Sequence, residues 1–184
     1  MQFQLDHAID ILRRTPGTLR HMLAGLDKPW VMSNYGEKTF SPFDVVGHLI
    51  HGEKDDWMTR ARIILERGEA RPFEPFDRYA MYEDSKGKSM ADLLDEFGAR
   101  RAANLLELES LGLTEAQFSL TGTHPALGRV TLGQLLATWV AHDLHHIAQI
   151  CKSMAFQYRS EVGPWLEYIG IIPRQAVEVQ RSRP

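Results

Sequence analysis

Two histidines stand four residues apart in the last third of the chain, His142 and His146. In a helix, residues at this spacing share one face, so their imidazoles can bind a single metal ion. Neutral imidazole is a good ligand for zinc, nickel, copper and iron. The spacing alone fits equally well a pair of hydrogen-bonded or surface histidines. Position favours a metal, because His142 falls in line with a mostly apolar face, and burying two bare imidazoles costs free energy that a metal removes.

A third ligand is expected from a second helix that faces the first. His48 lies on the apolar side of that helix, whereas His51 shares a more polar side with Asp44 and Asp55. We therefore predict that His48 completes the site and that His51 lies near the surface or the rim. Glu53, in the same stretch, either bonds a ligand histidine from behind or is a simple exposed charge. The exposed charge is the favoured interpretation.

The residue that follows His142 argues against a zinc protease. Helical HExxH sites place a glutamate base directly after the first histidine, and this chain has the shorter Asp143 there. The downstream third ligand of such proteases is not evident either. His145, between the two candidate ligands, is expected beside the site or on the surface, with an alternative role as a ligand.

Several further residues are candidates for a substrate pocket. Trp57 follows His48 by about two and a half helical turns, so it lines the same face or serves as a core aromatic. Arg60 and Arg78 are candidates to hold a carboxylate or the acid group of a thiol cosubstrate, although each also fits a solvated charge. Asp77 fits a salt bridge with its neighbour Arg78. His124 precedes a proline and is favoured as loop structure.

The elements that must position these residues are helical. Three helix starts carry a Ser or Thr cap, at Ser41, Ser89 and Thr131. No alternating strand pattern appears, so we predict one all-α domain over residues 1–184, an up-down four-helix bundle with a short C-terminal helical segment near 160–170. The helical stretches are 3–26, interrupted at Thr15-Pro16, then 41–66, 89 to the loop at 112, and 131–158; the irregular stretches are 27–40, 69–88 and 112–130.

Composition excludes several classes of protein. The formal net charge is −3, which provides no strong field for nucleic acid or an anionic membrane surface. The single cysteine cannot form an intramolecular disulfide, and the sequence contains neither a signal peptide nor an apolar run long enough to cross a bilayer. We therefore expect a cytoplasmic protein with a small-molecule substrate and without nucleic-acid or membrane partners.

The chain resembles the DinB/YfiT-like superfamily of four-helix-bundle proteins in several motifs. These are SPFDVVGHL and FEPFDR in the first half, and THPALG, VTLGQLLATWVAHD and VGPW in the second. The resemblance covers about residues 8 to 170. It implies a DinB-like bundle that holds one divalent metal ion, zinc or nickel, on three histidines. The family pattern has one histidine early in the second helix and His-x-x-x-His in the last, which here are His48, His142 and His146.

The resemblance also implies a range of activities. Members include thiol-S-transferases that use low-molecular-weight thiols such as bacillithiol or mycothiol, a mycothiol-dependent isomerase, and proposed hydrolases. Members often form homodimers. Three neutral histidines would leave a divalent ion with open positions, as in catalytic zinc sites, and such an ion ionises a bound water or a bound thiol.

Two classes of function therefore remain open from the sequence. The first is a metal-dependent enzyme acting on a small molecule, either a thiol-S-transferase with a thiol cosubstrate or a hydrolase. The second is a non-catalytic metal-binding bundle that binds a ligand or stabilises a dimer. A base near the metal would separate them, and the sequence shows no unambiguous one.

Overall fold

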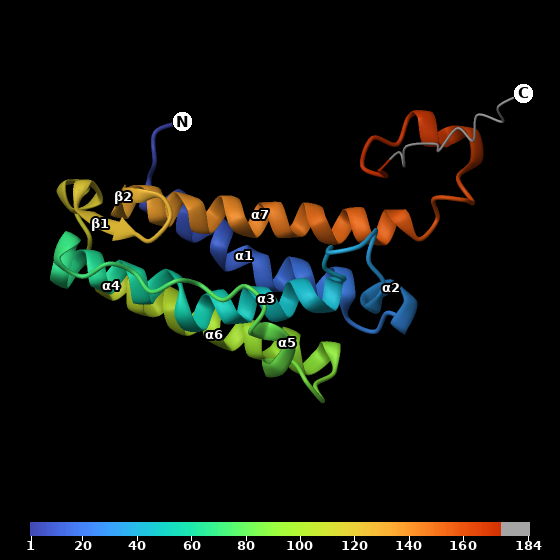
Figure 1. The fold of residues 1–184 in the computed structure, drawn as a ribbon, viewed down its shortest axis with the longest axis horizontal. Coiled ribbons are helices and arrows are strands. Elements are labelled where there is room, and N and C mark those ends of the chain that lie inside the picture. Colours follow the sequence, from blue (N-terminus) through green and yellow to red (C-terminus); the bar gives the residue numbers. More distant parts are fainter. Residues whose placement is uncertain (174–184) are drawn as a thin grey trace, which may run out of the picture.

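Four long helical segments form the body of the molecule, and the predicted four-helix bundle is confirmed (Figure 1). The computed structural model describes residues 1–173, so the predicted domain end at residue 184 lies outside the described residues. The long segments are α1 (Leu5–Leu23), α3 (Pro42–Asp55) continued by α4 (Trp57–Arg67), α6 (Met90–Ser110) and α7 (Leu132–Phe156).

The packing order differs from the order along the chain. Both α1 and α3 pack against α6 and α7, so α1 lies diagonally opposite α3, and α6 lies diagonally opposite α7. In Figure 1, α1 and α7 run in one direction, and α3–α4 and α6 run in the other. The order of directions is therefore up, down, down, up, which differs from the alternating up-down order expected from the sequence. The segment between α4 and α6 returns along the length of the bundle and makes this order possible.

The three predicted helix caps are confirmed. The side chains of Ser41, Ser89 and Thr131 each accept a hydrogen bond from the backbone N–H three residues later. In each case the residue at that third position also bonds back to the cap, which satisfies two otherwise unpaired donors. These caps set where α3, α6 and α7 begin, and so set which side chains face the centre of the bundle.

The predicted single helix over 41–66 is wrong at one residue. Asp56, with φ −110° and ψ −77°, separates α3 from α4. The backbone hydrogen bonds around it survive, because Asp56 N–H donates to the Gly52 carbonyl and Arg60 N–H donates to the Asp56 carbonyl. α3 and α4 therefore form one long helical segment with a kink at Asp56. A single aspartate in an otherwise helical pattern is too weak a signal to indicate such a kink.

The expectation of a chain without strands is also wrong. β1 (Thr121–His124) pairs antiparallel with β2 (Gly128–Thr131), with Thr121 opposite Thr131. Gly122 permits the hairpin to lie close to the bundle, because a Cβ there would meet the Phe73 ring at 2.9 Å. Strands of four residues are too short to show an alternating pattern.

Smaller elements occupy stretches that were expected to be irregular. They are α2 (Lys28–Met32), α5 (Met81–Asp84) and the 3-10 turns η1 (Gly68–Ala70) and η2 (Glu115–Ser119). The expected C-terminal helical segment is present as η3 (Gly163–Glu167), and the expected interruption of α1 at Pro16 is absent. Among residues 1–173, no helix combines the length and apolar character that crossing a membrane requires.

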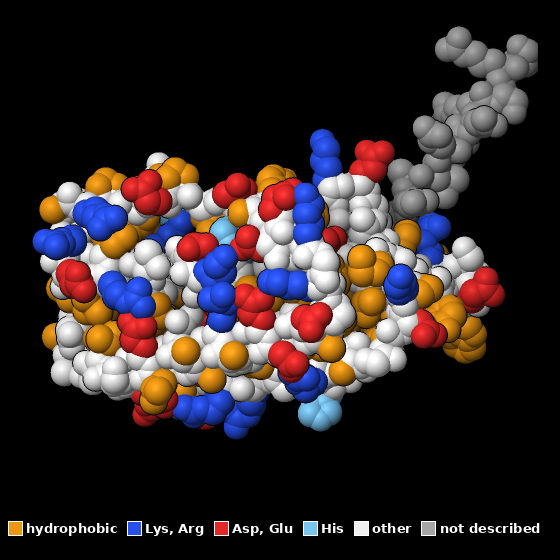
Figure 2. Space-filling model, turned by 90° about the horizontal axis from the view of Figure 1, so that it is seen from below, with side chains coloured by type: hydrophobic (Ala, Val, Ile, Leu, Met, Phe, Trp, Pro, Cys, Tyr) orange, Lys and Arg blue, Asp and Glu red, His pale blue; other side chains and the backbone are white. Residues whose placement is uncertain are grey.

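The buried apolar residues form two clusters at opposite ends of the bundle. One gathers around α4, the start of α7 and the end of α6, and the other around α2, α3, α5 and the start of α6. Between them lies a layer of buried polar side chains, which is where the candidate site is built. On the face shown in Figure 2, acidic and basic side chains are interspersed, so that face carries no single-sign field.

Candidate metal centre

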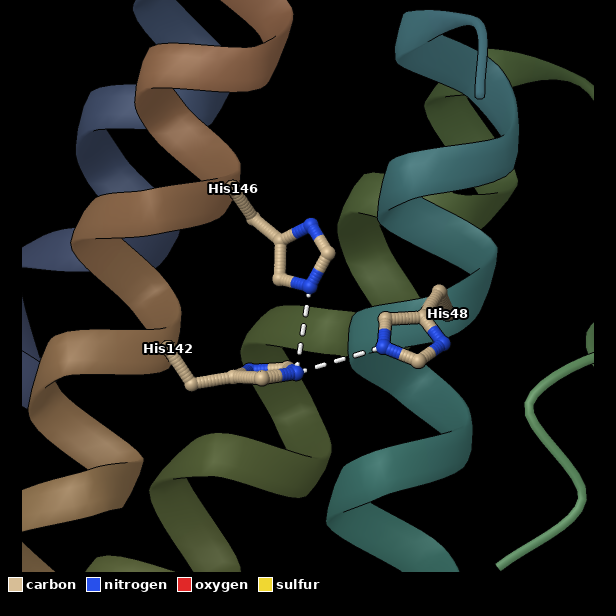
Figure 3. Close-up of side chains that lie close together, drawn as sticks. All are labelled: His48, His142 and His146. Carbon is tan, nitrogen blue, oxygen red and sulfur yellow. Dashed lines mark hydrogen bonds between the residues drawn. The ribbon is translucent and has the colours of Figure 1, made fainter. Parts of the chain in front are cut away.

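The structure brings the three predicted histidines together in the polar layer. His48 extends from α3, and His142 and His146 extend from one face of α7 (Figure 3). The Nε2 atom of His142 lies 3.2 Å from Nε2 of His48 and 3.1 Å from Nε2 of His146. Candidate ligand atoms of all three lie within 4.8 Å of one another. Three nitrogens from two helices therefore converge on one point.

Burial keeps these imidazoles neutral. It lowers the pKa of His48 to about 3, that of His142 to about 2 and that of His146 to about 4, and repulsion between the rings adds to the effect at His48 and His142. Each neutral ring carries one N–H and one lone pair. Nε2 of His142 can donate to only one neighbour, so lone pairs are left facing one another. A bound cation would satisfy all three, which is the chemistry of a three-histidine metal site.

The orientation of His146 agrees with this role. Its Nδ1 donates a hydrogen bond of 2.8 Å to Oε1 of Gln149, which leaves the lone pair on Nε2, the atom that faces the other two rings. Among the described residues, Nδ1 of His48 and Nδ1 of His142 have no hydrogen-bond partner. Gln149 is a residue that the sequence argument did not identify. Its place three residues after His146 could have suggested it, because such residues meet on a helix.

Aromatic rings surround the three histidines. The ring centroids of Phe40 and Phe76 lie 5.6 Å from that of His48, and the Trp57 ring lies 5.1 Å from that of His142. Trp57 is buried and also stacks on Trp139 at 5.7 Å, so it serves both the core and the site. These rings give the imidazoles a largely apolar surrounding.

A second buried polar group lies beside the histidines, around Arg101 of α6. Its guanidinium donates to Glu53 at 2.8 Å and 3.0 Å, to Asp143 at 2.6 Å and 3.0 Å, and to the Leu12 carbonyl at 2.8 Å. Glu53 also accepts hydrogen bonds from Trp139 and Asn104. Burial lowers the pKa of Arg101, but the two carboxylates raise it by more, so that it stays above its ordinary value. We call these residues (Arg101, Glu53, Asp143, Asn104 and Trp139) the Arg101 cluster.

The favoured interpretation of Glu53 as an exposed charge is wrong. Its side chain is fully buried, and the groups it bonds are Arg101, Asn104 and Trp139 rather than a histidine. The signal for this was absent from the local sequence, because Arg101 lies 48 residues away. Asp143, considered in the sequence only as an inadequate protease base, is the second carboxylate of the same cluster.

An open pocket of about 610 Å³ adjoins two of the three histidines. His48 and His142 form part of its wall, and so do four of the predicted candidates, Trp57, Arg60, Arg78 and His124. Its apolar lining includes Phe73, Pro75, Phe76, Leu127, Val130 and Leu135. The hairpin β1–β2 and the segment after α4 supply most of this wall, so the stretches expected to be long loops do cover the site.

The remaining candidates do not line this pocket. Asp77 accepts a hydrogen bond from the Tyr79 N–H at 2.9 Å and, within the described chain, makes no ion pair with Arg78. His145 is exposed, with its ring centroid 5.2 Å from that of His146. The prediction that His51 lies near the surface or the rim is wrong, because His51 is buried; its Nδ1 lies 3.1 Å from Oδ2 of Asp55, and its ring lies beside Phe76. His124, by contrast, does line the pocket, and it also holds the hairpin loop, because its Nδ1 accepts hydrogen bonds from Ala126 and Leu127 N–H at 3.1 Å.

One acidic residue of the pocket, Asp56, was not predicted from the sequence. Asp56, at the kink between α3 and α4, is buried, and its Oδ1 lies 2.7 Å from Nε of Arg60. Burial raises the pKa of Asp56 above its ordinary value, although Arg60 acts in the opposite direction. An aspartate four residues before an arginine on a helix could have suggested the pair, but the kink that turns it toward the pocket is a tertiary feature.

Comparison with solved structures finds the same architecture in other proteins. YfiT from Bacillus subtilis, described as a probable metal-dependent hydrolase with an unusual four-helix bundle topology, is 24% identical, with a TM-score of 0.69. The match covers 86% of this chain and 87% of YfiT, and it establishes the fold. No curated protein matches the sequence. The sequence pattern of the DinB superfamily matches residues 11–150, well over half of the chain. The chain therefore belongs to the DinB superfamily.

Proposed function

We propose that this protein binds one divalent metal ion, zinc or nickel, on His48, His142 and His146, and uses it to transform a small molecule held in the adjoining pocket. The observation that carries the proposal is the convergence of three Nε2 atoms beside an open pocket. The Nε2 atom of His142 lies within 3.2 Å of Nε2 of both His48 and His146. Three histidine ligands leave positions open for solvent or substrate, which distinguishes catalytic from structural zinc sites.

The residues around the site each have a part in this chemistry. The lowered pKa values keep all three ligand histidines neutral, so protons do not compete for the metal near pH 7. Gln149 holds His146 in the tautomer that presents Nε2. A divalent ion held there would supply a Lewis acid that activates water or a thiol. Arg60 and Arg78, as substrate-binding residues, would orient the molecule in the pocket.

Asp56 is the proton-accepting group that this scheme requires. Among the described residues that line the pocket, it is the only carboxylate. Its buried position and raised pKa are typical of groups that exchange protons in active sites. The presence of such a group favours an enzyme over a non-catalytic metal-binding bundle that binds a ligand or stabilises a dimer.

Hydrolysis is the first candidate reaction, because YfiT is described as a probable metal-dependent hydrolase and shares the fold. Transfer of a low-molecular-weight thiol is the second, because the same three histidines and the same pocket would serve a thiol as well as water. The two reactions differ in whether a thiol cosubstrate is consumed, which an assay distinguishes directly.

The test combines metal analysis with activity. We expect the purified chain to bind one equivalent of zinc or nickel, and to hydrolyse esters or amides of a small-molecule panel, or to conjugate monochlorobimane with one of the common bacterial thiols. His142→Ala removes both metal and turnover. The matched control is His145→Ala, an exposed histidine three residues along the same helix, which should retain both. Stoichiometric metal in His142→Ala would contradict the ligand assignment, and stoichiometric metal without turnover would favour the non-catalytic bundle.

A further inference from the structure

The wall of the pocket carries more positive than negative charge. Arg60 and Arg78 both line it, and Asp56 is the only carboxylate among its described lining residues. The metal proposed at the histidines would add two further positive charges. The whole chain, by contrast, has a formal net charge of −3. A positive pocket in an acidic protein indicates an anionic ligand, because the surrounding surface does not itself attract anions.

Arg60 is the better placed of the two cations. Its side chain is nine-tenths buried, whereas Arg78 is exposed. Asp56 holds it at Nε, 2.7 Å away, and the guanidinium carbon lies 5.3 Å from the centre of the Phe73 ring. One edge and one face of the guanidinium are therefore occupied, which fixes its orientation in the pocket.

The outer edge of the Arg60 guanidinium is left with unused donors. Nη2 reaches only the Glu74 carbonyl, at 3.5 Å, and Nη1 donates to none of the described residues. Arg62, one half-turn along α4, shows the contrast, because its Nε and Nη2 donate to the two oxygens of Glu107 at 2.6 Å and 2.7 Å. Nη1 is not one of the buried atoms without a partner, so it is accessible from solvent, and a carboxylate in the pocket could accept a charged hydrogen bond from it.

The apolar part of the pocket wall indicates that the rest of the ligand is apolar. Phe73, Phe76 and Leu135 are among the side chains that surround the space between Arg60 and the histidines. The hydrocarbon part of a small molecule would gain free energy by covering them. Because Trp57 contacts His142 and lies one helical turn before Arg60, a single small molecule can reach both the histidines and the guanidinium.

We propose that the pocket takes an organic acid with an apolar body, whose carboxylate binds Arg60 while its reacting group faces the three histidines. Asp56 positions the guanidinium, and Arg78 adds a second, exposed positive charge near the entrance. This inference rests on the proposed function and adds to it the chemical class of the substrate. The carboxylate would occupy the Nη edge of Arg60 rather than an open position on the metal.

The test uses phenylacetate and its neutral isostere phenylacetamide as probes. Binding of each is measured by titration calorimetry or ligand-observed NMR on the full chain, with zinc and after removal of zinc by a chelator. We expect phenylacetate to bind more tightly than phenylacetamide in both states. Arg60→Met should weaken phenylacetate binding by about tenfold or more, as expected for loss of a charged hydrogen bond, and change phenylacetamide binding by less than about twofold. Arg62→Met, a change of the same kind outside the pocket, should alter neither.

Two further measurements keep the outcome decisive. Arg60→Met leaves Asp56 buried without its partner, so the double variant Asp56→Asn with Arg60→Met is tested beside it, and it too should lose the preference for the acid. Phenylacetate binding that requires zinc and survives Arg60→Met would place the acid on the metal and overturn the inference, as would equal losses for acid and amide. Zinc stoichiometry is measured on the same samples. A chain that binds zinc but shows no preference for the acid contradicts this inference alone, whereas a chain that binds no zinc contradicts the proposed function.

Discussion

Two buried polar groups lie side by side in the middle of the bundle, and they differ in whether the chain satisfies them. In the Arg101 cluster, Arg101 pairs with both carboxylates, and Asn104 and Trp139 supply further donors to Glu53. In the histidine group, three Nε2 atoms face one another, and two Nδ1 atoms have no partner among the described residues. Buried polar groups are nearly always hydrogen-bonded in native proteins. The first group is therefore satisfied within the chain, whereas the second is left with lone pairs that the proposed metal ion would satisfy.

The complete group holds the incomplete one in place. Glu53 lies on α3, Arg101 on α6 and Asp143 on α7, so the cluster joins the three helices on which the site depends. Asp143 directly follows His142 in α7. Trp139, which donates to Glu53, stacks on Trp57, and Trp57 contacts His142. These contacts therefore help to fix the position of His48 relative to His142.

The largest effect on stability is expected when the Arg101 cluster loses its cation. Arg101→Met leaves Glu53 and Asp143 as buried carboxylates without a cation, and removing one partner of a buried pair costs about 3–5 kcal/mol. The unfolding free energy, measured by urea denaturation of the metal-free chain, should fall by that amount. Arg100→Met is the matched control, because Arg100 is its neighbour and makes an ion pair with the more exposed Glu96. Its loss should stay below about 1 kcal/mol. Equal losses in the two variants would contradict the contrast between the groups.

The next largest effect on stability is expected when zinc binds the three histidines. Zinc at about one hundred times its dissociation constant should raise the unfolding free energy by about 2.7 kcal/mol, because it binds the folded chain alone. His48→Ala should abolish this increment, since it removes the ligand that α3 supplies. His51→Ala, on the same helix but bonded to Asp55, should keep most of it. An increment of the same size in all three chains would show that zinc stabilises the protein from another site.

The two groups also differ in how much of them the sequence indicates. His142 and His146 belong to one helix, and their spacing alone places them on one face. His48 required only a judgement about which side of its helix is apolar. Arg101 carries no such local signal, because its partners lie on two other helices and its own helix pattern fits a surface arginine. Pairings between distant segments are set by tertiary packing, and a single sequence does not state them.

The same limit explains the features of the fold that differ from expectation. The helix starts at Ser41, Ser89 and Thr131 follow from capping chemistry within four residues, and all three were found. The kink at Asp56 and the hairpin at residues 121–131 depend on what packs against them, such as the Phe73 ring over Gly122. Both features line the pocket, so the sequence indicated the ligands of the site better than its walls.

The histidine group should make the unfolding free energy of the metal-free chain depend on pH. The pKa of His48 is lowered by burial to about 3 in the folded chain, from an ordinary value of 6.5. The unfolded chain therefore binds more protons below pH 6.5, and the contribution of neutral His48 to stability is lost as the pH falls from there toward 3. Metal-free wild type should lose unfolding free energy more steeply between pH 6 and pH 5 than His48→Ala, by up to about 1.4 kcal/mol per pH unit. Parallel profiles would show that this histidine is not held neutral by the fold.

The smallest effect is expected from the hydrogen bond that Gln149 supplies to the histidine group. Oε1 of Gln149 accepts from Nδ1 of His146 at 2.8 Å, and loss of such a partner costs about tenfold or more in metal affinity. Gln149→Leu should weaken zinc binding by about that factor, measured by competition with a chromogenic chelator. Gln149→Glu keeps an acceptor at the same place, so it should retain the wild-type affinity or exceed it. If the two substitutions weakened zinc binding equally, the contribution of Gln149 would be packing rather than the hydrogen bond. The histidine group would then depend on the Arg101 cluster alone for its geometry.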